Sequence, residues 1–326
     1  MRCDLAIVGA GPAGLYATYY AGFRGLSVAL VDSLPELGGQ VTAMYPEKAI
    51  LDVAGFPSVK GRELVDGLVA QALTAEPVQL LGRTAAGLVS DPEEGVELNL
   101  DDGMVVAAKA ALITAGIGKF SPRPLPAAEG WVGRGVEFFV PSFAPYADKD
   151  VVIVGGGDSA FDWALHLEPM ARSVTLVHRR DAFRAHQRTV DQVRASSAEI
   201  VTRAEVTGLC DAGGGTDGPL AQVEITVDGV ATTRPAQAVV AALGFLADLG
   251  PLQQWGLETS RRHIVVDPSM RTSLPRVFAA GDITEYDGKV RLIAVGFGEA
   301  ATAVNNAAVV IDPSAHVFPG HSSEGS

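Results

Sequence analysis

The stretch Gly9-Ala10-Gly11-Pro12-Ala13-Gly14, with the apolar run 5–8 directly before it, decides the fold of this chain. A short apolar run ending in glycine is typical of a buried parallel strand, and proline is tolerated in the first turn of a helix. The pattern occurs again at Gly155-Gly156-Gly157-Asp158-Ser159-Ala160, after the apolar run 151–154. Glycine-rich turns also occur in ordinary α/β cores, but between a strand and a helix they let a backbone approach a pyrophosphate.

The residues that follow the two loops carry opposite charges. Asp32 lies 23 residues after the first glycine of its loop, whereas the same spacing in the second copy leads to His178, followed by Arg179 and Arg180. A carboxylate accepts hydrogen bonds from a free ribose 2′-hydroxyl and repels a 2′-phosphate, and arginines do the reverse. Alone, Asp32 would be a solvated turn residue and the basic cluster, with Arg184, a solvated face. At strand ends, they predict an FAD-like dinucleotide first and NADP second.

The chain carries an approximate internal repeat of a strand–helix–strand unit, and each copy is followed by segments that we expect to be antiparallel. These segments include 79–81, 95–100 and 105–114 after the first copy, and 199–205, 221–227 and 237–243 after the second. The predicted class is α/β with two Rossmann-like dinucleotide-binding domains of three-layer ββα type. We expect the NADP domain, 116–245, to be inserted into an FAD domain made of 1–115 and 246–326, with glycine-bearing crossings suited to hinges.

Composition narrows the class of protein. The 326 residues are 48% hydrophobic and 19% charged, with a net charge of −13, which argues against nucleic acid or an anionic membrane as the main partner. No apolar run reaches the roughly 20 residues of a membrane span, and the N-terminus leaves no room for a signal peptide. The two cysteines, Cys3 and Cys210, form no CxxC, so a disulfide framework, a zinc site, an iron–sulfur cluster or another metal site is not expected. Two free buried thiols fit the cytoplasm.

The pair Gly281-Asp282 follows the apolar segment 276–280 and precedes a helix expected at about 294–310. It could simply cap that helix. In a domain that already holds a dinucleotide, its carboxylate could instead bond a ribityl hydroxyl of FAD. Tyr45 alone would be a packed surface tyrosine, and His321 a residue of a disordered tail.

The chain resembles the two-domain flavoprotein reductases of the thioredoxin-reductase type over essentially its whole length. The resemblance rests on both glycine loops, on the basic segment and on 279–282. Within this group it is most similar to the ferredoxin–NADP reductases, on the segments 37–40, 45–48, 52–57 and 319–323. Thioredoxin reductases carry a redox CxxC before the second loop, where this chain has Phe138-Phe139-Val140-Pro141. Without that dithiol, electrons cannot pass from flavin to a protein disulfide.

The resemblance implies specific roles. Tyr45 would stack on one face of the flavin and His321 on the other, the latter delivered by the C-terminal tail of the partner in a homodimer. Asp32 stands where many relatives have glutamate. The shorter acid changes the reach of the carboxylate but not its charge. The implied FAD contacts are Gly9, Gly11, Pro12, Ala13, Gly14, Asp32, Gly39, Gln40, Tyr45, Ala85, Phe120, Asp282, His321, Ser322 and Ser323. The implied NADP contacts are Gly155, Gly157, Asp158, Ser159, Ala160, His178, Arg179, Arg180 and Arg184.

The implied function is electron transfer between NADPH and ferredoxin or flavodoxin, by hydride transfer to flavin followed by single-electron steps. No residue is needed as a general acid or base. Two other functions fit the same motifs: an NADPH-dependent reductase of small acceptors such as quinones or ferric chelates, and a non-catalytic sensor that binds FAD and NADP as ligands.

Overall fold

The computed structural model describes residues 1–320, apart from the side chains of Lys119, Phe120 and Ala247. The chain forms two compact units, one made of Met1–Lys119 with the chain from Ala247 onward, the other of Phe120–Leu246. The second unit is therefore an insertion in the sequence of the first. The strands β9 (Lys119–Pro122) and β18 (Phe245–Asp248) carry the chain across the two boundaries and pair with each other.

Seven strands form the main sheet of the first unit: β1 (Arg2–Val8), β2 (Val28–Asp32), β5 (Val78–Leu81), β6 (Ala85–Asp91), β7 (Gly95–Leu100), β8 (Val105–Ile113) and β21 (Val277–Ala279). Their order is β5-β2-β1-β8-β7-β6, and β1 pairs in parallel with both β2 and β8. The long strand β8 takes β7 antiparallel beside its first half and β21 parallel beside its last residues. The carboxyl ends of β1, β2, β8 and β21 therefore meet at one edge of the sheet.

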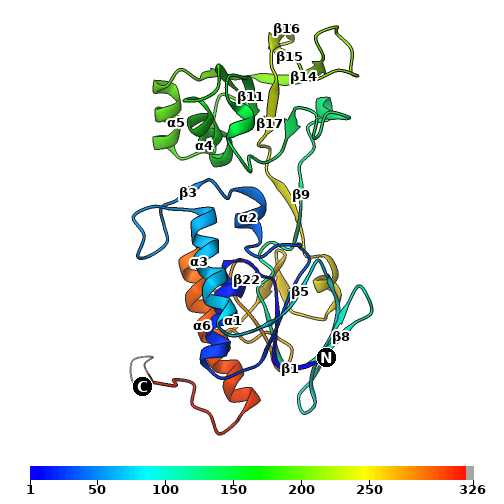
Figure 1. The fold of residues 1–326 in the computed structure, drawn as a ribbon, viewed down its shortest axis with the longest axis vertical. Coiled ribbons are helices and arrows are strands. Elements are labelled where there is room, and N and C mark those ends of the chain that lie inside the picture. The colour runs from blue at the N-terminus through cyan, green and yellow to red at the C-terminus, as the bar shows by residue number, and fades with distance from the viewer. Residues whose placement is uncertain (321–326) are drawn as a thin grey trace. The chain divides into compact units, whose positions relative to one another are not determined.

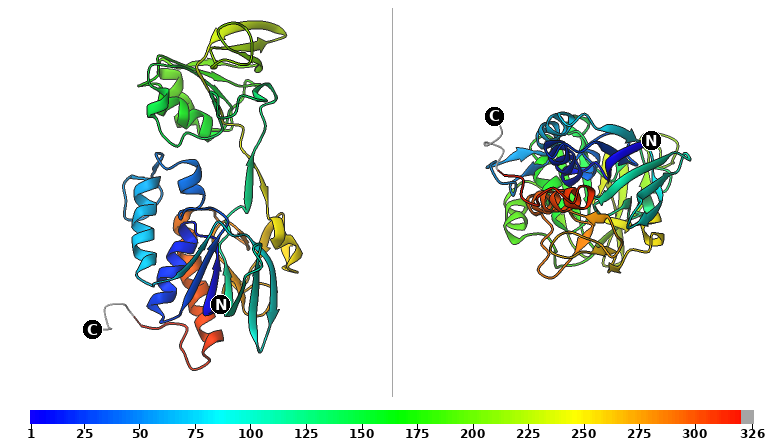
Figure 2. Two further views of the ribbon diagram at one scale, coloured as in Figure 1. Left: turned by 45° about the vertical axis from the view of Figure 1, so that its right-hand side comes forward. Right: turned by 90° about the horizontal axis from the view of Figure 1, so that it is seen from below.

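Three helices, α1 (Pro12–Phe23), α3 (Gly61–Leu73) and α6 (Ile293–Ile311), lie side by side on one face of this sheet (Figure 1). The antiparallel strands β6 and β7 lie away from these helices (Figure 2, left). Shorter elements complete the unit: α2 (Gln40–Met44), β3 (Ala49–Ile50), β4 (Val59–Lys60), the 3₁₀ turn η3 (Gly250–Gln254), β19 (Thr259–Ser260), β20 (His263–Val265) and β22 (Thr284–Glu285).

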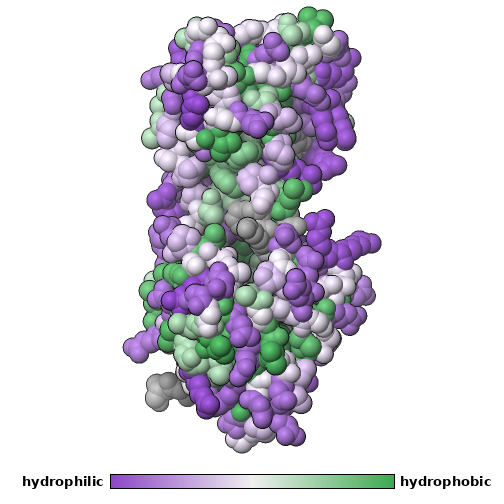
Figure 3. Space-filling model, turned by 90° about the vertical axis from the view of Figure 1, so that its right-hand side faces the viewer, coloured by the Kyte–Doolittle hydropathy of each residue, from purple (hydrophilic) through white to green (hydrophobic). Residues whose placement is uncertain are grey.

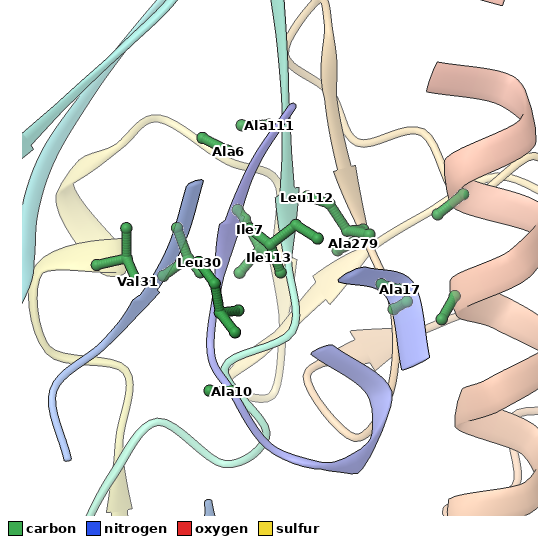
Figure 4. Packing of buried hydrophobic residues seen from close by; sticks show 14 of the residues in the cluster. Ala6, Ile7, Ala10, Ala17, Leu30, Val31, Ala111, Leu112, Ile113 and Ala279 are labelled. Atoms are coloured by element: carbon green, nitrogen blue, oxygen red, sulfur yellow. The ribbon is translucent and has the colours of Figure 1, made fainter. Parts of the chain in front are cut away.

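The core of the first unit lies between the parallel strands and the helices. Ile7, Leu30, Leu112 and Ile113 are buried and come from three neighbouring strands, and Ala17 of α1 lies close to them (Figure 4). Small side chains on the helices allow close approach to the sheet and so bury these large aliphatic groups. This packing fixes the strand ends that carry the glycine loop.

Helix α6 is, among residues 1–320, the one helix long and apolar enough to cross a membrane by length and composition. The sequence had led us to expect no apolar segment of that length. Ala300, Ala303 and Ala307 are fully buried, and α6 packs against α1, β8 and β21, so it serves as a core helix of this unit.

The second unit repeats the parallel arrangement on a smaller scale. Its five-stranded sheet has the order β10-β17-β11-β12-β13, from β10 (Val136–Glu137), β11 (Asp150–Val154), β12 (Ser173–Val177), β13 (Glu199–Val201) and β17 (Ala238–Ala241). Helices α4 (Asp158–Leu167) and α5 (Gln187–Ala195) pack on each other. An antiparallel sheet follows, from β14 (Ala204–Cys210), β15 (Gln222–Val227) and β16 (Val230–Pro235), and two 3₁₀ turns precede β11, η1 (Pro126–Ala128) and η2 (Ala144–Tyr146).

The α/β class and the two Rossmann-like units are confirmed, but part of the predicted antiparallel material is wrong. The segments 79–81 and 237–243, and the first half of 199–205, form β5, β17 and β13, which pair in parallel. For β5 the reason is α3, because a helical crossover returns the chain in the direction of the preceding strand. Strand β6, which has a bulge between Ala85 and Gly87, was not predicted at all.

Cys3 and Cys210 are free, as expected, but each is half-buried rather than buried, and burial raises the pKa of Cys3 to about 11.

One face of the molecule shows hydrophilic side chains separating small hydrophobic patches (Figure 3). Exposed apolar side chains such as Leu51 and Phe56 occur on loops, whereas the strand ends gather the residues singled out by the sequence.

Candidate functional site

The first glycine loop joins β1 to α1 through two backbone contacts that exclude a side chain. A Cβ added to Gly14 would lie 1.8 Å from the carbonyl oxygen of Gly9, and one added to Gly9, whose φ is +108°, would lie 2.5 Å from the carbonyl oxygen of Thr114. Around Gly11, by contrast, an added Cβ would meet no atom within 4 Å. Two glycines of the motif therefore serve the fold, and the third faces open space where a phosphate fits.

Asp32 ends β2 beside this loop. Its Oδ2 accepts a hydrogen bond from the backbone N–H of Ala10 at 2.5 Å, and its Oδ1 accepts one from Leu34 at 2.8 Å. Burial raises the pKa of the Asp32 carboxyl, and these two backbone donors oppose the shift. A carboxylate has about four acceptor positions, so capacity for a ribose hydroxyl remains. The loop and the acid thus fit the adenosine half of a dinucleotide.

A second backbone segment closes against the first loop. Gly38 donates its N–H to the carbonyl oxygen of Ala10 at 2.9 Å, and a Cβ on Gly39 would lie 2.8 Å from the Cα of Gly11. Gln40 begins α2, and its Nε2 lies 2.9 Å from where a Cβ of Gly116 would be. The predicted residues Gly39 and Gln40 therefore belong to this site.

Tyr45 follows α2 and is half-buried. Burial raises the pKa of its hydroxyl to about 12, with smaller contributions from the negative charges of Asp282 and Asp52. These contributions bring Tyr45 and Asp282, which are far apart in sequence, into one electrostatic environment. Tyr45 is neutral at physiological pH, and its side chain packs against the hydrophobic core of the first unit.

Asp282 lies three residues after the end of β21 and is also half-buried. Burial raises the pKa of its carboxyl, while Lys289 and Arg291 act in the opposite direction. The alternative that Asp282 caps the following helix is wrong, because α6 begins only at Ile293 and its N-cap is Leu292. The carboxylate is therefore not used by that helix.

The remaining predicted FAD residues fall into three groups. Pro12 and Ala13 open α1, and an added Cβ on Gly281 would touch Ala13 at 3.1 Å. Ala85 begins β6, just after Arg83, whose N–H donates to the carbonyl oxygen of Asp32 at 3.0 Å. The side chain of Phe120 and the residues His321, Ser322 and Ser323 lie outside the described part of the chain.

The second glycine loop makes its own close contacts. A Cβ on Gly155 would lie 2.4 Å from the carbonyl oxygen of Ala242, and one on Gly156 would lie 2.3 Å from the ring of His178. Gly157 is the N-cap of α4 and has no atom within 4 Å of an added Cβ. Asp158 and Ser159 open that helix and are exposed, and Ala160 is buried behind them.

The basic segment is fixed to this loop through its backbone. Arg184 donates its N–H to the carbonyl oxygen of Gly156 at 2.8 Å, and His186 donates its N–H to Oδ1 of Asp158 at 2.8 Å. Arg179, Arg180 and Arg184 have exposed side chains. Because the carboxylate of Asp158 accepts the hydrogen bond from His186, it helps to hold the backbone of the basic segment beside the loop.

His178 contributes packing rather than charge. Burial lowers the pKa of its imidazole, and the nearby Arg179 and Arg180 lower it further, against a hydrogen bond that the ring donates to the backbone of Ala182. The ring lies 5.6 Å from that of Phe183, centre to centre. A neutral imidazole at physiological pH leaves the permanent positive charge of this site to the arginines.

Three residues of the first site were missed by the sequence analysis. Thr114 donates its hydroxyl to the carbonyl oxygen of Gly9 at 2.7 Å. Glu299 and Lys289 form an ion pair beneath Gly281, and their side chains are 5% and 1% exposed. A signal existed for Glu299, since it is the single charged residue in the apolar sequence of α6.

Comparisons with known proteins agree with this geometry. Residues 3–307 match the family model for pyridine nucleotide-disulphide oxidoreductases. A ferredoxin–NADP reductase of Nocardioides sp. is 76% identical over 99% of this chain and 97% of its own, and one of Frankia alni is 63% identical over 98% of each. Among solved structures, the thioredoxin reductase of T. acidophilum is 25% identical with a TM-score of 0.78, and the match covers 94% of this chain and 98% of that one.

The first glycine loop yields a pair of substitutions with different outcomes. We expect Gly11→Ala to leave thermal unfolding of the FAD-free chain nearly unchanged, because the added Cβ meets no atom within 4 Å. It should weaken FAD binding by about tenfold, since the methyl group enters the space of the pyrophosphate. Gly14→Ala should instead destabilise the fold by more than about 2 kcal/mol. Fluorescence titration measures the FAD affinity of each variant, and denaturant unfolding measures its stability. Equal effects of the two changes would contradict this division of roles.

The basic segment predicts cofactor preference. Replacing Arg179 and Arg180 together by alanine should lower the ratio of NADPH to NADH affinity by about tenfold or more, because charge-assisted hydrogen bonds to a 2′-phosphate are lost. Arg172→Ala is the matched control, an exposed arginine just before β12 at the opposite end of the strand. Isothermal titration with both nucleotides gives the ratio, and an unchanged ratio in the double variant would show that the assignment is wrong.

Proposed function

The chain belongs to the pyridine nucleotide-disulphide oxidoreductases, within the ferredoxin–NADP reductases, and we propose that it transfers electrons between NADPH and ferredoxin through bound FAD. The observation that carries the proposal is the contrast between its two glycine loops. A half-buried carboxylate, Asp32, follows the first, and exposed guanidinium groups follow the second. Relatives between 61% and 76% identical over nearly the full chain carry the same name.

Different residues bind the different parts of FAD and NADPH in this proposal. In the proposed FAD site, Gly11 leaves room for the pyrophosphate, Asp32 accepts from the adenosine ribose, and Asp282 accepts from the ribityl chain. Bound FAD supplies the conversion of a two-electron hydride into two single-electron transfers. The protein's part is to orient this group and exclude water, so a catalytic acid or base is unnecessary. Arg179, Arg180 and Arg184 hold the 2′-phosphate of NADPH in the second site.

The chain lacks the redox CxxC by which thioredoxin reductases pass electrons from flavin to a protein disulfide. Thioredoxin reductases share the fold, but the sequence holds only Cys3 and Cys210, which lie in different units and are both free. Burial raises the pKa of Cys3 to about 11, so its thiol is protonated and unreactive at physiological pH. We also propose a cytoplasmic location, where free thiols persist, which cell fractionation would check.

The acceptor can be tested by steady-state kinetics. We expect NADPH-dependent reduction of cytochrome c to be slow with the protein alone and to rise by more than about tenfold on addition of ferredoxin, because single electrons then pass through the carrier. Flavodoxin in the same assay tells whether it replaces ferredoxin. Equal rates with and without a carrier would instead indicate a reductase of small acceptors, and no turnover a non-catalytic sensor.

A homodimer with an exchanged C-terminal tail completes the proposal. Arg24 supports it, since its guanidinium donates to the carbonyl oxygens of His316 at 2.8 Å and Val317 at 3.2 Å and so anchors the tail at the end of α1. From this anchor His321, Ser322 and Ser323 would reach the flavin of the partner.

Sedimentation equilibrium should give twice the chain mass of 33.8 kDa. A chain that ends at Gly320 should still form a dimer and show brighter flavin fluorescence, because a stacked ring that quenches the flavin is gone. A monomer mass for the full chain would contradict the proposal. An unchanged fluorescence would contradict the stacking role of His321.

A further inference from the structure

A buried ion pair lies directly beneath the Gly281–Asp282 turn. The Nζ of Lys289 donates to Oε1 of Glu299, and the two side chains are 1% and 5% exposed. Tyr286 donates its hydroxyl to the same oxygen at 2.6 Å. Glu299 projects from α6, whereas Lys289 and Tyr286 belong to the segment between β22 and that helix. The pair therefore joins the helix to the segment between β22 and α6.

Both charges act on one residue, Gly281. Its backbone N–H donates to Oε2 of Glu299 at 2.7 Å, and its carbonyl oxygen accepts from Nζ of Lys289 at 3.0 Å. The hydroxyl of the fully buried Thr284 also donates to this carbonyl oxygen at 2.8 Å. The φ of Gly281 is +84°, a conformation that side chains rarely adopt. Each polar backbone atom of this left-handed residue is thus held by a buried charge.

The held turn is in contact with the first glycine loop. A Cβ on Gly281 would lie 3.1 Å from that of Ala13, in the first turn of α1, and one on Gly296 of α6 would lie 3.5 Å from the Cα of Gly281. The turn is therefore enclosed between two helices. A displacement of Gly281 would move Asp282, the next residue, relative to the loop that faces the pyrophosphate.

Stability alone does not account for such a pair. Burying two charges is costly, and apolar residues of similar volume often replace a buried ion pair without loss of stability. A pair that bonds both polar atoms of one glycine instead specifies a backbone conformation.

We infer that Glu299 and Lys289 are positioning residues that preset the Gly281–Asp282 turn for FAD. The inference rests on the proposed function, since it assigns Asp282 to the flavin cofactor. Glu299 accepts the N–H of the Ala280–Gly281 peptide, and Lys289 neutralises Glu299 and donates to the carbonyl oxygen of the Gly281–Asp282 peptide. The carboxylate of Asp282 is then in place before FAD arrives, so binding does not have to order the turn.

Two neutral double variants isolate this role. Lys289→Met with Glu299→Gln removes both charges but keeps an oxygen that can accept the N–H of Gly281. Lys289→Met with Glu299→Leu removes the charges and the acceptor as well. At similar volume, the two variants differ in whether residue 299 can accept the hydrogen bonds of Gly281 and Tyr286, so a difference between them reports these hydrogen bonds and not charge.

We expect the glutamine variant to bind FAD within about threefold of the unchanged chain, and the leucine variant to bind it about tenfold more weakly or worse. Flavin fluorescence titration gives both dissociation constants, and the visible spectrum of bound FAD should shift in the leucine variant only. Lys109→Met with Asp4→Asn is the control, an ion pair at the amino end of β1 whose loss should leave FAD affinity unchanged.

Equal FAD affinities and spectra in the two double variants would overturn the inference. If the leucine variant does not fold, Glu299→Asn in the same Lys289→Met background replaces it, because the shorter amide cannot reach the N–H of Gly281, and the same criterion applies. The two proposals fail separately. An unchanged chain that binds no FAD overturns the proposed function together with this inference, whereas a chain that reduces ferredoxin but shows no difference between the variants overturns the inference alone.

Discussion

The first unit depends on the closest backbone approach in its glycine loop, between Gly14 and the carbonyl oxygen of Gly9. A Cβ at Gly14 would be 1.8 Å from that oxygen, so α1 can begin at the very end of β1 only because no side chain is present. Thr114 stabilises the contact by donating its hydroxyl to the same oxygen at 2.7 Å. The turn directs the free N–H groups of α1 toward the sheet edge, and phosphate binding follows from that orientation.

The second unit meets the same steric demand with different polar chemistry. Gly155 and Gly156 are confined by the carbonyl oxygen of Ala242 and the ring of His178. In the first unit a carboxylate, Asp32, accepts from the glycine loop, whereas in the second the loop bonds the backbone of the basic segment. Two glycine loops that each join a strand to a helix can therefore favour different nucleotides, because the element that each loop fixes beside itself carries the opposite charge.

Features that depend on a local sequence pattern could be predicted from the sequence. Strand pairing and hydrogen bonds between residues far apart in the sequence could not. Helices, apolar strands and the charges after each loop follow from short spacings, so Asp32 and the arginines were correctly expected at the ends of β2 and β12. The direction of β5 was wrong, because pairing depends on α3 and not on the strand's own residues. Thr114 and Glu299 were missed, because Glu299 bonds Gly281 across 18 positions and Thr114 bonds Gly9 across 105.

The difference in burial between the two sites also affects how fast each ligand dissociates. In the first site the acceptors are half-buried or buried and already fixed by backbone donors, as for Asp32 and Glu299. Binding to such preset groups costs little ordering entropy, which favours a slowly dissociating cofactor. In the second site the cations are exposed arginines on flexible stems, whose ion pairs are weakened by water and salt. A resident flavin and an exchanging nicotinamide nucleotide are the ligands that this difference suits.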